Sequence, residues 1–372
     1  MARILFCTTS YPPEARGGAE RQAKLQAEEL VRRGHRVTVV CHAFGRRRCT
    51  MINGVRIVRL PGAEGSRLPT LTYGLVLAAY LATQIRYFDI VHVHLASFHV
   101  HIAAFFAMIF RRPLYLKLGT GGERGDIAWL QPRARFTRLF GLRRANRIQA
   151  ISREIFDEAV GLGIAQDKVL RIANGYDQAT FRPFEGSKER LRQELDLPED
   201  RTIVLFTGRF IVQKGLIDLL EVWPAVTREA VLVLVGAAPS REYAVQGLKP
   251  TEDVIVRGWT EEIEDYLHAA DIFVLPSYSE GMSNSLIEAM ACGLAVISTR
   301  VGAAEEMIED GRSGLIVAPG DRAGLAEALN RLIASPELRA SMGRLAAETT
   351  AARYSISGVA DAIEAAYGDL RS

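Results

Sequence analysis

Short apolar runs rich in β-branched residues alternate with longer amphipathic stretches along the chain. The runs are typical of buried strands, and the stretches between them have helical spacing. In the first half, strands are expected at 3–8, 36–41, 55–60, 90–94, 114–118, 147–151 and 169–172. Helices are expected at about 20–33, 71–87, 97–110, 134–145 and 152–162. This alternation predicts a parallel, doubly wound α/β sheet.

The same alternation restarts after an interruption at 181–187, where Pro183 and Gly186 indicate a linker. Strands are then expected at 202–207, 231–235, 254–256, 272–275, 295–298 and 315–317. Helices are expected at about 215–227, 261–269, 285–291, 322–334, 336–352 and 354–367. A length of 372 residues also suits two cores. We therefore expect two Rossmann-like domains, at 1–182 and 183–353, that face each other across a cleft, because such sheets bind ligands at the carboxyl ends of their strands.

Composition places the chain among ordinary globular proteins, with 48% hydrophobic and 24% charged residues. The four cysteines lack metal-ligand spacing, and a disulfide framework is not expected. The start of the chain lacks a signal-peptide pattern, and the apolar run 95–110 carries two histidines and is short for a membrane span. We expect a cytoplasmic protein and assign this run to a buried helix.

Charge is distributed unevenly between the halves. Residues 1–182 hold 28 Lys and Arg against 13 Asp and Glu, a net charge of +15, whereas residues 183–372 hold 18 against 30, a net charge of −12. The basic half could attract a phosphorylated acceptor, an anionic membrane surface or nucleic acid, or the two domains could simply attract each other. The run at 46–48 is interpreted as a solvated loop, and the arginine cluster at 133–147 as either surface or a contact for anionic headgroups.

A pair of glutamates follows a strand in the second half of the chain. Glu280 and Gly281 form a loop at the strand's carboxyl end, and Ser283 or Asn284 can cap the next helix, which carries Glu288. Both carboxylates could therefore reach one ligand. Free N–H groups of Asn284, Ser285 and Leu286 would provide an anion site. Carboxylates suit sugar and ribose hydroxyls, and a helix start suits phosphate. In the alternative interpretation, the glutamates only cap a helix and face solvent.

Arg209 and Lys214 bracket the loop after the strand at 202–207. Two cations there can offset the charges of a diphosphate. The sequence contains no Asp-x-Asp motif, so a metal-chelating diphosphate site has no obvious ligands. No metal is expected.

These residues, in this order, resemble family 4 of the retaining glycosyltransferases, whose Glu-x7-Glu signature corresponds to Glu280 and Glu288. The resemblance extends over nearly the whole chain. It also covers Gly17-Gly18, 89–94, 174–177, 181–183, Gly208-Arg209, Lys214-Gly215, Val301-Gly302 and 314–321. It implies the GT-B fold, with the last segment, 354–372, crossing back to the first domain.

The resemblance also implies a reaction: transfer of a hexose from a UDP- or GDP-linked sugar to a glycan or lipid-linked acceptor, as in cell-surface polysaccharide or glycolipid synthesis. Arg209 and Lys214 would bind the diphosphate, Glu288 the ribose and Glu280 the sugar. Gly17 and Gly18 would let their loop approach the donor closely. The segment from Gly281 to Ser285, with Met282, Ser283 and Asn284, would complete the donor site. No cofactor beyond the donor is implied.

The chain departs from the family where many members carry a histidine near the reacting sugar. Gly119 falls at about that place, in a loop whose polar groups are Lys117, Glu123 and Asp126. One of these groups, or the backbone, would take over the role, and His94 is another candidate. Of His92 and His94, we expect one to face the cleft, preferably His94, and the other to pack against a helix.

Two alternative functions stay open. The chain could be a nucleotide-sugar epimerase of the same fold, or an inactive partner subunit that binds a sugar nucleotide. A phosphorylase would need a pocket with a pyridoxal-bearing lysine, and the sequence gives no support for one. A dehydrogenase is disfavoured because no Gly-x-Gly-x-x-Gly follows the first strand of either domain. As partners we expect the donor, the acceptor and a peripheral contact with the inner face of the membrane through the basic domain, without nucleic acid.

Overall fold

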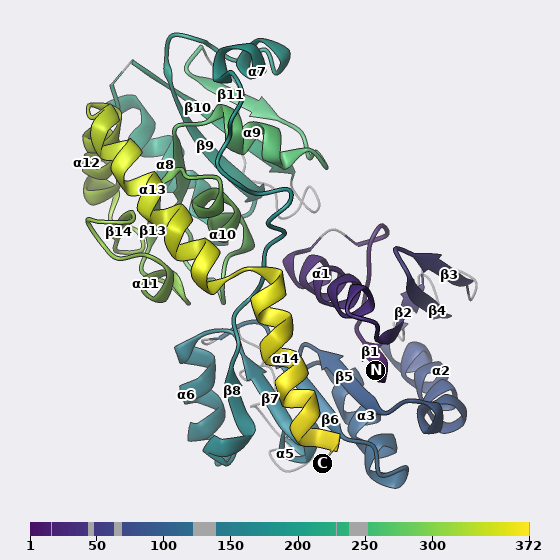
Figure 1. The fold of residues 1–372 in the computed structure, drawn as a ribbon. Coiled ribbons are helices and arrows are strands. Elements are labelled where there is room, and N and C mark those ends of the chain that lie inside the picture. The colour runs from purple at the N-terminus through teal and green to yellow at the C-terminus, as the bar shows by residue number, and fades with distance from the viewer. Residues whose placement is uncertain are drawn as a thin grey trace. The chain divides into compact units, whose positions relative to one another are not determined.

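The computed structural model describes residues 1–15, 17–43, 48–62, 69–121, 139–227, 229–237 and 252–371. The chain divides into two compact units. The first unit contains Met1–Gly175 and Ile356–Ser372, and the second contains Tyr176–Ser355. Each unit is an α/β structure built on its own sheet (Figure 1).

The first unit holds an eight-stranded sheet in the order β3-β4-β2-β1-β5-β6-β7-β8. Its strands are β1 (Arg3–Cys7), β2 (Arg36–Ala43), β3 (Arg48–Ile52), β4 (Val55–Pro61), β5 (Ile90–His94), β6 (Leu114–Leu118), β7 (Arg147–Ala150) and β8 (Val169–Arg171). All neighbours are parallel except β3, which pairs antiparallel with β4 at the edge. The strand order reverses direction between β1 and β5, so the ligand position expected for a doubly wound sheet lies there.

Helices cover both faces of this sheet. They are α1 (Gly18–Arg32), α2 (Pro69–Gln84), α3 (Phe98–Ile109), α5 (Phe140–Arg144), α6 (Arg153–Gly161) and α14 (Ile356–Arg371). Helices α1 and α14 lie side by side over a core that includes Phe6, Val39 and Ile363 (Figure 1). Helices α2, α3 and α5 form a contiguous group, since α3 packs against both of the others.

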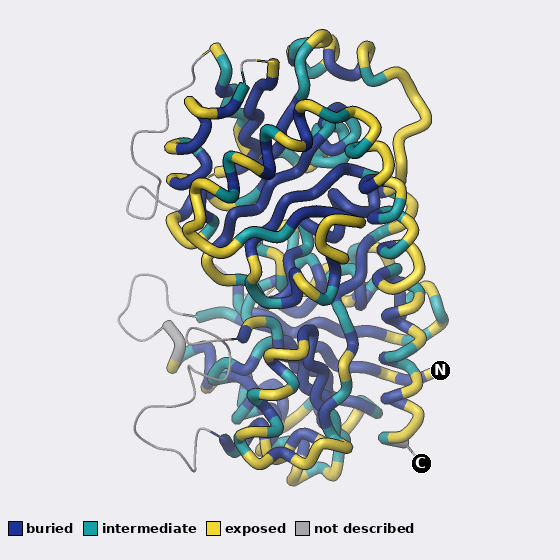
Figure 2. The backbone as a smooth tube through the Cα atoms, turned by 90° about the vertical axis from the view of Figure 1, so that its left-hand side faces the viewer, coloured by how far each residue is buried: buried dark blue, intermediate teal, exposed yellow. Residues whose placement is uncertain are grey.

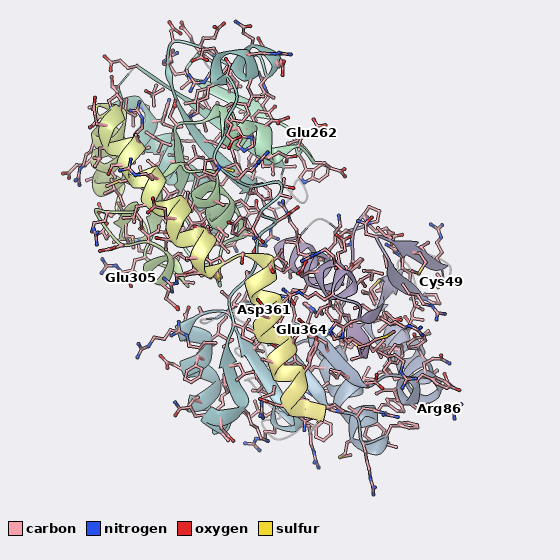
Figure 3. The ribbon with its side chains drawn as sticks, in the orientation of Figure 1. Cys49, Arg86, Glu262, Glu305, Asp361 and Glu364 are labelled. Carbon is pink, nitrogen blue, oxygen red and sulfur yellow. The ribbon has the colours of Figure 1, made fainter. Side chains whose placement is uncertain are left out.

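An ion-pair network fastens α14 to α1. Arg33, the residue that ends α1, contacts the carboxylates of Asp361 and Glu364, the latter at 2.6 Å. Glu364 also lies 2.6 Å from His35, and Figure 3 labels both acidic residues on α14. The last helix is thus a component of the first unit.

The second unit holds a six-stranded parallel sheet in the order β11-β10-β9-β12-β13-β14. Its strands are β9 (Thr202–Arg209), β10 (Ala230–Ala237), β11 (Val254–Arg257), β12 (Ile272–Leu275), β13 (Ala295–Thr299) and β14 (Leu315–Val317). Its helices are α7 (Lys188–Glu194), α8 (Leu216–Val222), α9 (Ile263–Ala269), α10 (Asn284–Ala291), α11 (Ala304–Met307), α12 (Arg322–Ile333) and α13 (Pro336–Arg353). The interior strands of both sheets are buried along most of their length (Figure 2).

The prediction of two doubly wound parallel sheets is confirmed. Strands β5, β6, β12 and β14 have the predicted bounds, and most other elements differ by one to three residues. Strand β3 and helices α7 and α11 were not predicted. Strand β3 begins at Arg48, which is exposed but not in a loop as interpreted, and Arg46 and Arg47 lie outside the described residues. The strand is exposed at the sheet edge and lacks a burial pattern. Of the helix expected at 134–145, residues 134–138 lie outside the described residues.

None of the described helices is both long enough and apolar enough to cross a bilayer. The apolar run 95–110 instead contains α3, whose inner side chains, such as Val100 and Ala103, are buried against the rest of the first unit. This agrees with the interpretation of the run as a buried helix.

Candidate active site

The loop between β12 and α10 holds the predicted glutamates. Strand β12 is fully buried and ends at Leu275, and α10 begins at Asn284. Ser283 caps the helix, since its Oγ accepts a hydrogen bond from the Leu286 N–H at 3.4 Å. The predicted serine cap is thus confirmed, but the expectation that the Leu286 N–H is free was wrong. The hydroxyls of Ser283 and Ser285 lie 3.1 Å apart at the same helix start.

Lys214 and Glu280 form an ion pair at this loop. The Lys214 Nζ donates to Glu280 Oε1 at 2.6 Å, and the Ser277 hydroxyl donates to the same oxygen at 2.7 Å. The side chains of Lys214 and Glu280 are 16% and 13% exposed, so the pair is partly shielded from water while still accessible. Such a pair holds a cation and a carboxylate in fixed positions next to each other.

Sheet topology explains why these two residues meet. Strands β9 and β12 are neighbours at the point where the strand order reverses, so the loops after their carboxyl ends are adjacent. The Tyr278 N–H donates to the Gln213 carbonyl at 2.8 Å, which joins the two loops directly.

Two glycines permit this close approach. Gly215 has φ +68°, and a Cβ there would lie 1.7 Å from the Pro276 carbonyl oxygen. Gly302 has φ +54°, and its Cβ would lie 2.3 Å from the Gly281 carbonyl oxygen. Because the obstructing atoms are backbone, these positions require glycine. The Ala303 N–H also donates to that Gly281 oxygen at 2.9 Å, which fixes the loop of Glu280.

The other two predicted donor residues belong to the same unit. Arg209 ends β9 and is exposed. Glu288 lies on α10 and is only 5% exposed. Its charge adds to the effect of burial in raising the pKa of the Cys292 thiol one turn further along the helix.

A polar cluster beside this loop escaped the sequence reasoning. The Tyr278 hydroxyl donates to Asp218 on α8, and Arg322 Nε, at the start of α12, donates to the same carboxylate at 2.8 Å. The hydrogen bond to Asp218 raises the pKa of Tyr278, and burial adds to this. Tyr278 could have been predicted as a site residue, because it lies two residues before Glu280. Asp218 and Arg322 lie in no motif that would have indicated a role.

In the first unit, His92 and His94 lie on β5, and His92 packs against a helix, as expected for one of the two. Their rings stack on the same face of the sheet with centroids 4.4 Å apart, because residues two apart in a strand point the same way. His92 Nδ1 lies 2.6 Å from the Tyr367 hydroxyl of α14. Burial, together with the charge of Lys117, lowers the pKa of both rings well below the usual value, so both are neutral near pH 7.

Lys117 lies beside these rings at the end of β6, paired in register with His94. It is 4% exposed, and its Nζ donates to Asn174 Oδ1 at 2.6 Å. Gly119 follows two residues later. Glu123 and Asp126 lie outside the described residues. The acceptor-side candidates that the structure describes are therefore His94, Lys117 and Gly119, around the carboxyl ends of β5 and β6.

Gly17 and Gly18 lie at the start of α1 in the same unit. Gly17 is the residue before the helix, and a Cβ there would lie 2.2 Å from a carboxylate oxygen of Glu20. The Ser10 hydroxyl donates to the other Glu20 oxygen at 2.6 Å. The Glu20 side chain could rotate away from such a Cβ, so this contact alone does not require glycine at position 17. At Gly215 and Gly302 the obstructing atoms are backbone and cannot move aside in this way.

Comparison with known families covers most of the chain. The family described as Glycosyltransferase Family 4 matches residues 16–180, and the family described as Glycosyl transferases group 1 matches residues 201–335. The first match begins in the first unit and ends at residue 180, just past that unit's boundary at Gly175, and the second match lies within the second unit.

Individual relatives agree. An alpha-maltose-1-phosphate synthase of Mycobacterium tuberculosis is 30% identical over 365 residues, which cover 90% of each chain. TuaC of Bacillus subtilis, named for a role as a glycosyltransferase in teichuronic acid biosynthesis, is 28% identical over 88% of each chain. Among solved structures, Anabaena Alr3699/HepE in complex with UDP-glucose matches with a TM-score of 0.83 and 21% identity, over 99% of this chain and 100% of that one.

The structural match confirms the GT-B fold that the resemblance implied. The sequence relatives and the two family matches show the family to which the chain belongs. This chain therefore belongs to glycosyltransferase family 4 and is a glycosyltransferase.

Proposed function

We propose that the chain is a retaining, metal-independent hexosyltransferase that uses a UDP- or GDP-linked sugar and a glycan or lipid-linked acceptor. The proposal is carried chiefly by the Lys214–Glu280 pair, which lies beside the capped start of α10. This arrangement offers a cation for a diphosphate next to a carboxylate for a sugar. HepE, which has the same fold, was solved with UDP-glucose, and this supports a nucleotide-sugar donor.

The donor residues divide the nucleotide sugar between them. Arg209 and Lys214 would bind the diphosphate, while Glu288 would hold the ribose hydroxyls. Glu280 would contact the transferred hexose. Because Ser277 and Lys214 both donate to Glu280, its carboxylate is oriented before the donor arrives.

In the reaction we propose, the bond between the sugar's anomeric carbon and the diphosphate oxygen breaks. The acceptor oxygen forms its new bond on the same face, and its proton passes to the departing diphosphate. The main task of the protein is then to stabilise the charge that develops on that diphosphate. Arg209 and Lys214 can supply this stabilisation without a metal, and the chain has no Asp-x-Asp motif to chelate one.

The acceptor would bind to the first unit, through Gly17, Gly18, Lys117, Gly119 and His94. Lys117, which lies two residues before Gly119 and donates to Asn174, would take the place of the family histidine. Synthesis of a cell-surface polysaccharide or glycolipid is supported by the name of TuaC. Such an acceptor would bring the basic first unit to the inner face of the membrane.

A thermal-shift screen of UDP- and GDP-linked sugars tests the donor assignment, because a ligand that binds the folded state raises the unfolding temperature. A rise with one nucleotide sugar that is lost in Glu288→Ala supports it, and no rise with any of them contradicts it. Incubation with donor alone then separates activities: sugar isomer formed without acceptor identifies an epimerase. Binding without turnover over a broad acceptor panel identifies an inactive partner subunit.

A further inference from the structure

One face of α3 in the first unit exposes large apolar side chains. The helix contains no charged residue along its whole length. Phe105, Met108 and Ile109 are 47%, 41% and 52% exposed, and their spacing places them on one helical face. Adjacent exposed side chains of this size indicate a surface that contacts a partner.

Arginines border this face. A cavity of about 370 Å³ is lined by Arg111, Arg112 and Arg144, together with Met108 of α3 and Leu370 of α14. Within the described part of the chain, none of the three arginines forms an ion pair with a carboxylate. The Arg144 guanidinium lies 5.9 Å from the Phe140 ring centroid, so it rests on an apolar surface.

A further cation extends the patch. Arg112 donates to the backbone carbonyl of Arg86 at 2.7 Å. The exposed Arg86, labelled in Figure 3, has its guanidinium over the ring of Tyr87. Two carboxylates in the described part of this unit pair with other arginines. Asp369 pairs with Arg147 at 3.5 Å, and Asp89 pairs with Arg3 at 2.8 Å. The patch therefore keeps a positive charge.

The position of the patch separates it from the acceptor-side residues. Arg86 precedes β5, Arg111 and Arg112 precede β6, and Arg144 precedes β7. All of them lie at the amino ends of parallel strands, whereas His94, Lys117 and Gly119 lie at the carboxyl ends. Substrates bind at the carboxyl ends in such sheets, so the patch has another task.

We propose that Phe105, Met108, Ile109, Arg111, Arg112 and Arg144 form a docking patch for an anionic phospholipid bilayer. The three apolar side chains enter the boundary between headgroups and acyl chains, and the arginines bind lipid phosphates. Nucleic acid would engage the arginines but would not require the apolar face of α3. This patch is the surface that makes the membrane contact of the proposed function, and its assignment rests on that function.

Co-sedimentation with vesicles tests this assignment. The full chain is mixed with phosphatidylcholine vesicles and with vesicles that also contain phosphatidylglycerol. We expect binding to the anionic vesicles only, weakened by salt. Since each arginine near an anionic surface contributes roughly a fivefold gain in binding, Arg111→Glu with Arg144→Glu should lower the partition coefficient by ~30-fold or more. Phe105→Ser with Ile109→Ser should lower it as well.

The matched control reverses two exposed arginines of the second unit, Arg331→Glu with Arg344→Glu, and should bind like the wild type. All variants should keep the wild-type thermal unfolding and the wild-type thermal shift with the donor. Equal loss in the control, or wild-type binding by both patch variants, would overturn the proposal. So would binding of a short DNA duplex that is abolished by the arginine changes, with no vesicle binding. If the wild type binds vesicles but no nucleotide sugar, the proposed function fails and the patch stands.

Discussion

The Nζ of Lys214 lies 2.6 Å from Oε1 of Glu280, although 66 residues separate them in the chain. The contact exists because β9 and β12 are adjacent where the strand order of the sheet reverses. The cation that we propose for the diphosphate and the carboxylate that we propose for the sugar are thereby held next to each other, and each orients the other.

The role of Lys214 predicts a loss of rate. Lys214→Ala should lower kcat by roughly 10²–10³-fold, the usual cost of removing one group that stabilises transition-state charge. Lys214→Arg keeps the charge and should retain more activity than the alanine variant. Steady-state transfer assays measure both. A kcat for Lys214→Ala within about twofold of the wild type would show that the residue does not stabilise the departing diphosphate.

The loop geometry predicts a difference between glycines. Gly215→Ala and Gly302→Ala each place a Cβ against backbone at a positive φ, and each should destabilise the second unit by roughly 1–3 kcal/mol. Gly258→Ala is the control, because nothing lies within 4 Å of its Cβ and its φ is not positive. Urea unfolding measures the free energies. Similar losses in all three variants would contradict the packing described for the donor loops.

The stacked histidines predict a dependence of stability on pH. Burial lowers the pKa of His92 and His94 in the folded state, and it lowers that of His99 to about 4. An unfolded histidine, with a pKa near 6.5, takes up a proton that the folded one refuses, so stability falls as pH drops below about 6.5. Each such histidine contributes a slope of up to ~1.4 kcal/mol per pH unit.

Urea unfolding between roughly pH 7.5 and pH 5.5 measures this slope before most carboxylates titrate. His94→Gln removes one titrating ring and should reduce the slope by about one proton's contribution. A slope that His94→Gln leaves unchanged would mean that His94 is protonated in the folded protein.

Lys117 predicts a separation between donor and acceptor effects. Because it lies in the first unit beside His94, Lys117→Met should raise the acceptor KM or lower kcat while the dissociation constant for the donor stays unchanged. Lys168→Met, at a half-buried position before β8, serves as the control. Isothermal titration and transfer kinetics provide the two readouts. Wild-type kinetics in Lys117→Met would remove it from the acceptor side.

Much of the fold could be predicted from the sequence because buried parallel strands are nearly continuous apolar runs. Strands β5 and β12 illustrate this, since their bounds match the prediction. Strand β3 could not be predicted in this way, because an exposed edge strand has no apolar run. Helix α11 spans four residues and is too short for periodicity to appear.

The parts of the site that lie in a sequence motif could be predicted. The contacts between residues that are distant in the chain could not, because they depend on how the elements pack. The loop around Glu280 and its serine cap follow from local sequence. The salt bridge from Lys214 to Glu280, and the bonds from Tyr278 and Arg322 to Asp218, depend on which loops the sheet brings together. The common face of His92 and His94 follows from strand alternation and could have been deduced.

The anomeric configuration of the transfer product, read by NMR in a reaction that contains EDTA, tests the retaining, metal-independent mechanism most directly. The wild type, given the donor found by thermal shift, should form a product with the configuration of the donor sugar. Arg209→Ala and Glu288→Ala should form almost none. An inverted product, a strict requirement for added metal, or unchanged turnover in both variants would contradict this mechanism.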